Sequence, residues 1–143
     1  MAAFGKPENA SLQAAFKFFE ELLASAQRAG ERIYVITDLT RMTELAPASQ
    51  RKYSGEWLER TFSLQRAATL GVANVSSSVI VRGLVTAINW FKDVPMPTVW
   101  VSSRREAYAA AARAFDRAGT RLRPELGAWL RGASAPAVTE GGR

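Results

Sequence analysis

The stretch Arg32-Ile33-Tyr34-Val35-Ile36-Thr37-Asp38-Leu39 decides the fold. It is rich in β-branched residues and predicts a buried strand. Before it, residues 11–29 carry apolar side chains at spacings of three and four, which predicts an amphipathic helix that ends at Gly30. After it, residues 47–68 repeat a helical pattern, and Pro47 suits the first helical position. A strand between two helices indicates an α/β chain.

The same alternation continues toward the C-terminus. Gly71 precedes a short predicted strand at 72–75, and Ser76-Ser77-Ser78 then offers an N-cap for a helix over 79–91. A further strand is predicted at 98–101, followed by a helix over 104–118 that Ser102 or Ser103 caps and Gly119 ends. The order α-β-α-β-α-β-α predicts a small parallel-rich sheet of about three to five strands flanked by helices.

Residues 1–131 are expected to form one domain. Residues 120–131 predict one further turn or short helix around Leu122, Leu126 and Trp129. Residues 132–143 are small and polar, and a disordered tail is expected there. Neither a membrane span nor a secretory signal is expected from the sequence, which favours a cytoplasmic location.

The composition favours binding over catalysis. The chain has 143 residues with no histidine and no cysteine. Histidine-dependent catalytic relays and zinc sites built from thiolate and imidazole are therefore excluded, and no metal or cofactor is predicted. The net charge of +6 lies mainly in residues 104–143, where a solvated basic face explains it. Because the four tryptophans are dispersed, a nucleic-acid stacking platform is not indicated.

Three blocks of sequence carry a resemblance to a known family. They are Ile36-Thr37-Asp38 with Gln50-Arg51 and Glu56-Trp57-Leu58; Gly71-Val72-Ala73 with Ser78, Arg82-Gly83 and Thr86-Ala87-Ile88-Asn89-Trp90; and Pro95-Met96-Pro97 with Ser102 and Glu106-Ala107. Over residues 10–118 the chain resembles bacterial STAS-like (SpoIIAA-like) domains, a largely uncharacterised group. The resemblance implies a small sheet flanked by helices and a role in protein–protein regulation without catalysis. The shape is also similar to CRAL-TRIO lipid carriers, which implies a small apolar ligand as an alternative.

The chain departs from that family in two places. The phosphorylatable serine motif is absent, and Ser49 is the comparable serine; an ordinary serine in the first turn of a helix is the simpler interpretation. The one or two strands that usually open such domains are also missing before residue 11. Either they are lost, or a partner strand completes the sheet, and an exposed sheet edge would favour pairing with another subunit.

Arg82 is the candidate centre of a ligand site. It is the single charge on the predicted helix 79–91, and a buried guanidinium needs a partner, for which Asp38 is a candidate. Alternatively, Arg82 with Ser76, Ser77 and free helix amides binds an anion beyond the carboxyl edge of the sheet. The structural and the anion-binding interpretations both stay open.

Three further residues are candidates for an interaction surface. Trp100 alternates with Val99 and Val101, so it is expected on the opposite face of the sheet, where it could anchor a contact. Gly83 inside a helix is explained by the close approach of another helix, and Trp90 is a core or ligand-pocket residue.

Three functions follow, in order of preference. The first is a regulatory domain that binds protein and forms a homodimer through helix 79–91 or a sheet edge. The second is a domain that binds a small apolar or anionic ligand, or a lipid, near Arg82 and Trp90. The third is an enzyme whose anionic substrate is held by Arg82.

Overall fold

Three parallel strands form the centre of the molecule. The computed structural model describes residues 9–42, 46–79, 81–83 and 96–135. In this part of the chain the strands are β1 (Ile33–Asp38), β2 (Thr69–Val75) and β3 (Thr98–Val101), paired in the order β1-β2-β3. Both pairings are parallel, so the carboxyl ends of the strands meet at one edge. The predicted α/β class and the small parallel sheet are confirmed.

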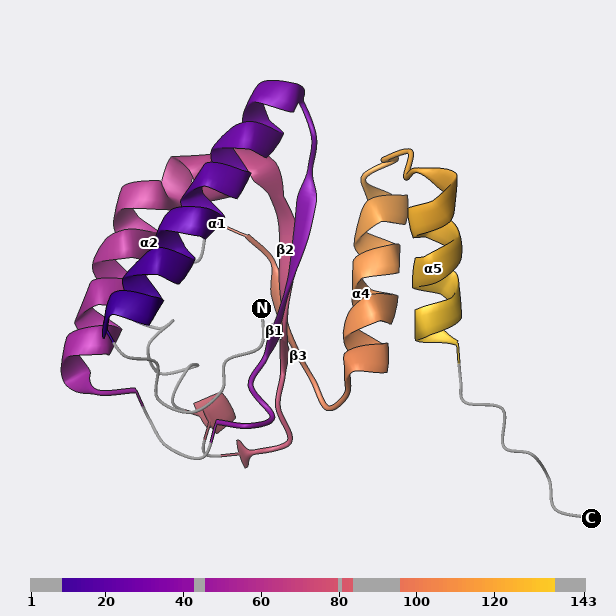
Figure 1. The fold of residues 1–143 in the computed structure, drawn as a ribbon. Coiled ribbons are helices and arrows are strands. Elements are labelled where there is room, and N and C mark those ends of the chain that lie inside the picture. Colours follow the sequence, from indigo (N-terminus) through magenta and orange to yellow (C-terminus); the bar gives the residue numbers. More distant parts are fainter. Residues whose placement is uncertain (1–8, 43–45, 80, 84–95, 136–143) are drawn as a thin grey trace, which may run out of the picture.

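Helices lie on both sides of this sheet. Figure 1 shows α1 (Asn9–Ala29) and α2 (Ala48–Ala68) on one side, and α4 (Arg104–Arg117) and α5 (Pro124–Ser134) on the other. α4 lies against the strands, whereas α5 packs mainly on α4. Gly30 and Gly119 follow α1 and α4 with φ of 66° and 62°, so both predicted glycine stops are confirmed.

Apolar side chains fill three connected regions. Leu23 of α1 and Ala68 at the end of α2 are fully buried and pack with Ile33 of β1. On the other face, Ala73 and Val75 of β2 pack under Ala107 of α4. A third cluster joins α4 to α5 through Ala111, Phe115 and Leu130. Each helix therefore buries part of its apolar surface either on the sheet or on its neighbouring helix.

Aromatic rings hold α1 against α2. The rings of Phe16 and Trp57 stack with centroids 4.4 Å apart and planes 6° apart. Phe19 contacts the same tryptophan at 5.8 Å in a tilted arrangement. Trp57 is only 4% exposed, so this ring of the stacked pair is part of the core. This contact joins two helices that are separated in sequence by β1.

Strand β2 begins earlier than predicted. Its pairing with β1 starts at Thr69, directly after α2, and the register is irregular between Ile33 and Tyr34. Gly71 was expected directly before the strand, but it lies inside it. A Cβ built there would lie 2.9 Å from Cε2 of Tyr34 and 3.1 Å from the carbonyl oxygen of Pro97. Gly71 is therefore in the strand because other groups occupy the space of a side chain.

The C-terminal helix differs from its prediction in length and orientation. α5 runs to Ser134, three residues into the segment predicted as tail, and the Ser134 hydroxyl donates to the Arg131 carbonyl oxygen at 3.2 Å. Leu126 and Trp129 were predicted to be its apolar centre, but they are 44% and 53% exposed, while Leu130 is buried. Trp129 contacts Tyr108 of α4 edge-on at 5.0 Å instead. The remainder of the predicted tail lies outside the described residues.

The predicted helix 79–91 falls largely outside the described residues, and so does Trp90. Val79 and residues 81–83 are helical, and they agree with its predicted beginning. Ser78 caps it, since its Oγ accepts from the backbone amide of Val81 at 3.3 Å. No helix in the described ranges combines the length and the hydropathy that crossing a membrane requires.

Candidate functional site at the carboxyl edge of the sheet

The carboxyl ends of the strands bring several predicted site residues to one edge. β1 ends at Asp38, Ser76 follows β2, and Ser102 follows β3. Backbone bonds continue past the strand ends: the Leu39 amide donates to the Val75 carbonyl at 2.9 Å, and the Ser76 amide donates to the Val101 carbonyl at 3.0 Å. These bonds fix the three strand ends side by side.

Arg82 binds the loop that follows β2. Its Nε and Nη2 donate to the Ser76 carbonyl oxygen at 2.8 and 2.6 Å, and Nη2 also lies 3.2 Å from Oγ of Ser102. One guanidinium thus ties the end of β2 to the end of β3. These contacts support the structural interpretation of Arg82, because two of its N–H groups are used inside the protein.

Asp38 has a different partner from the one considered in the sequence. Its Oδ2 accepts from Nε of Arg104 at 2.5 Å, and its Oδ1 accepts from the amide and the hydroxyl of Thr40 at 3.0 and 2.6 Å. The hydrogen bonds from Thr40, then Arg104, lower the pKa of Asp38 from 3.8 to about 2. Asp38 and Arg82 therefore share the edge, but the described contacts of Asp38 are with Thr40 and Arg104.

The start of α4 completes this edge. Oγ of Ser103 accepts from the Glu106 amide at 3.2 Å, so Ser103 is the N-cap, one of the two serines predicted. The Glu106 carboxylate reaches back and accepts from the Ser102 amide at 2.9 Å. This reciprocal arrangement is close to a capping box, and the spacing of Ser103 and Glu106 is the signal that could have predicted it.

The serines of the candidate anion site have separate roles. Ser76 is 1% exposed, and its Oγ accepts from the Ser78 amide at 3.2 Å. Ser77 is exposed. The buried hydroxyl of Ser76 therefore stabilises the turn that precedes Val79. Of the two serines, Ser77 is the one whose side chain reaches solvent.

The interaction candidates lie on separate parts of the molecule. Val99 and Val101 face α4, so Trp100 points to the side of α1 and α2, as strand alternation predicts. For Gly83, the described residues place no atom within 4 Å of a built Cβ, so the predicted neighbouring helix is not found among them. Ser49 is exposed in the first turn of α2, and no contact in the described structure distinguishes it from an ordinary serine of a first turn.

Sequence reasoning missed half of this edge. Thr40, Ser102, Arg104 and Glu106 were not assigned to it, although each contributes a hydrogen bond. Within the described residues, no three carboxylate side chains lie close enough together to hold a metal ion. The arrangement joins the strand ends to the start of α4 through the Asp38–Arg104 ion pair and the hydrogen bonds of Arg82 and Glu106. Comparison of the chain with protein-family models, with curated proteins and with solved structures found no match.

Proposed function

We propose that this chain is a non-catalytic regulatory domain that acts by binding protein, beginning with a second copy of itself. The observation that supports self-association is an exposed apolar stripe on α1. Phe18 is 64% exposed and Leu22 is 42% exposed, one helical turn apart. Ala14, one turn before Phe18 on the same face, is also exposed and apolar. Large apolar side chains next to each other on a helix are typical of an interaction surface.

The charges beside this stripe favour a second copy as the partner. Lys17 and Glu21 flank Phe18 and Leu22, both are exposed, and neither forms an ion pair with another described residue. When two copies of α1 pack antiparallel about a two-fold axis, Leu22 of one lies against Phe18 of the other. Lys17 of each copy then faces Glu21 of the other copy, so the two-fold axis gives two such contacts between opposite charges. The surface is therefore complementary to itself.

The regulatory role rests on the family resemblance, which implies protein–protein control without catalysis. The contacts of Arg82 favour this proposal over the anion site that was the alternative, because they show its guanidinium holding Ser76 and Ser102. Among the described residues, the exposed pair Phe18 and Leu22 makes α1 the proposed dimer surface, whereas most of the predicted helix 79–91 lies outside them.

Light scattering coupled to size-exclusion chromatography, over a micromolar concentration series, tests the proposal. The protein is expected to convert from monomer to dimer. The L22S change should weaken the dimer at least about tenfold, because apolar burial is lost in both copies. Leu126 on α5 has nearly the same exposure, 44% against 42%, so L126S is the matched control and should leave the dimer intact.

Charge reversal supplies a second, independent readout. K17E places a negative charge opposite Glu21 of the other copy, at both symmetry-related contacts, and should weaken the dimer. E21K should weaken it too, because two positive charges then face each other. The double variant K17E/E21K restores opposite charges and should recover the dimer. A chain that stays monomeric throughout the series would contradict the proposal. So would a dimer that L126S disrupts as strongly as L22S does.

A further inference from the structure

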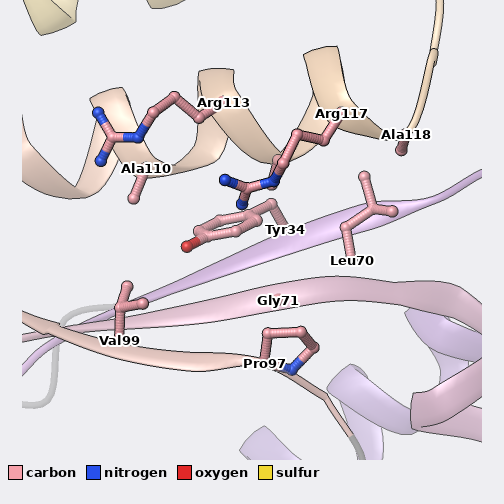
Figure 2. A pocket seen from close by; sticks show the side chains of 10 residues that line it. Tyr34, Leu70, Gly71, Pro97, Val99, Ala110, Arg113, Arg117 and Ala118 are labelled. Atoms are coloured by element: carbon pink, nitrogen blue, oxygen red, sulfur yellow. The ribbon is translucent and has the colours of Figure 1, made fainter.

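A pocket of about 370 Å³ lies between the C-terminal half of α4 and the amino-terminal halves of the strands. It is at the opposite end of the sheet from the Arg82 edge. Figure 2 shows the ring of Tyr34 between α4 above it and the strands below it. The residues that line the pocket are Tyr34, Leu70, Gly71, Pro97, Val99, Ala110, Arg113, Ala114, Arg117 and Ala118. We call it the Tyr34 pocket.

The Tyr34 ring, Pro97 and Val99 line the strand side of the Tyr34 pocket. Gly71 has no side chain, and the Tyr34 ring occupies that space, 2.9 Å from where a Cβ would lie. Val99 is 41% exposed although it is on a strand facing α4. Because α4 leaves Val99 partly exposed, a small ligand can contact this apolar side chain. The volume is at the lower end of the range found for small-molecule sites, which is about 300 to 1,000 Å³.

Two arginines supply the charge of the Tyr34 pocket. Arg113 and Arg117 are one turn apart on α4, and Figure 2 shows the Arg117 guanidinium next to the Tyr34 ring and the Arg113 side chain reaching back along α4 toward Ala110. Within the described residues neither guanidinium has a carboxylate in ion-pair contact. Burial raises the pKa of Tyr34, while the charges of Arg113 and Arg117 oppose that rise. The phenol therefore stays neutral at pH 7 and can donate a hydrogen bond.

We propose that the Tyr34 pocket binds a small monocarboxylate with a flat apolar body, whose carboxylate is held by Arg113 and Arg117 and whose body lies against the Tyr34 ring, Pro97 and Val99. Guanidinium groups match the planar fork of a carboxylate. A single negative charge fits better than the two of a phosphate ester, since the last turn of α4 carries partial negative charge that opposes added anions. This inference is independent of self-association through α1, because the two surfaces share no residue.

Titration of the full-length chain followed by amide NMR shifts tests this, with sodium benzoate as the probe. Saturable shifts are expected at Gly71, Val99, Ala110 and Ala114. Benzyl alcohol has a similar ring and no charge, and it should bind at least about tenfold more weakly, which corresponds to the loss of charge-assisted hydrogen bonds. Inorganic phosphate should also bind more weakly than benzoate, because it gains nothing from contact with Pro97 and Val99.

Arginine substitutions then distinguish binding in the pocket from a general effect of net charge on benzoate binding. R113Q and R117Q should each weaken benzoate binding, and the double variant should abolish it. R105Q makes the same charge change on the first turn of α4, outside the pocket, and should leave binding unchanged. All three arginines are exposed, so the variants are expected to fold. Equal binding of benzoate and benzyl alcohol, tighter binding of phosphate, or undiminished binding in R113Q/R117Q would overturn the proposal.

Discussion

Gly71 is the position in the sheet where one added methyl group matters most. A Cβ at this site would lie 3.1 Å from the Pro97 carbonyl, which belongs to backbone and moves little, and 2.9 Å from the Tyr34 ring. We expect G71A to lower the free energy of unfolding by about 1 to 3 kcal/mol, the usual cost of overpacking. Gly132, in helix α5 with no atom within 4 Å, is the matched control.

G132A should have the opposite sign, since alanine stabilises a helix interior by up to about 1 kcal/mol relative to glycine. Urea unfolding of both variants beside the wild type measures the two effects. If G71A is as stable as the wild type, the Tyr34 ring and the Pro97 backbone can move aside at little cost, and the explanation given for Gly71 is wrong.

The lowered pKa of Asp38 makes the stability of the folded chain depend on pH in the acid range. This pKa is about 2 in the folded chain against an ordinary 3.8, so folding keeps this carboxylate ionised. The unfolded chain binds the proton first as the pH falls, and stability is lost between about pH 4 and pH 2; above pH 4 the contribution is complete. In D38N this part of the acid dependence should disappear, while other carboxylates titrate as before.

Urea midpoints from pH 2 to pH 6 measure the Asp38 effect. T40V removes the hydroxyl that donates to Asp38 and should move the loss of stability to higher pH, without abolishing it. Identical pH profiles for the wild type and D38N would contradict this account of the edge.

At the scale of elements, the stacked pair Phe16–Trp57 joins α1 to α2. These helices touch each other more extensively than α1 touches the sheet, so the position of α1 depends on that contact. F16A should lower the free energy of unfolding by about 2 kcal/mol, less than for a fully buried phenylalanine because Phe16 is half-buried. It should also change the tryptophan emission, since Trp57 would lose its stacked neighbour.

V79A is the control for F16A. Val79 is 81% exposed, so its truncation should change stability by no more than about 0.5 kcal/mol. Urea unfolding monitored by fluorescence distinguishes the two variants. A cost for F16A as small as that of V79A would mean that α1 is held mainly by Leu23 and Ala26.

Elements with strong local signals were predictable from the sequence. The β-branched run predicted β1, the glycines after α1 and α4 predicted the ends of those helices, and Ser103, the cap of α4, was one of the two serines considered. β2 was placed too late because Gly71 resembles a turn residue when the Tyr34 ring beside it is unknown. In α5 both Trp129 and Leu130 are apolar, and which one is buried depends on where α4 lies.

On the scale of the whole molecule, the sites were less predictable than the fold. Topology let the sequence place Asp38, Ser76 and Arg82 at one edge, because parallel strands end together. The choice of Arg104 as the partner of Asp38 depends on the orientation of α4. The Tyr34 pocket depends on the same packing, since its phenol and its arginines come from elements far apart in sequence that only the folded chain brings together.

The parallel sheet also determines the order in which the chain can become folded during synthesis. When β1 leaves the ribosome its neighbour β2 has not been made, and no hairpin can form in the meantime. The face with Tyr34, Ile36 and Val75 stays uncovered longer, until β3 and then α4 have emerged. A growing chain therefore exposes an apolar sheet face until α4 has been made, and a chain released before that point should be prone to aggregation.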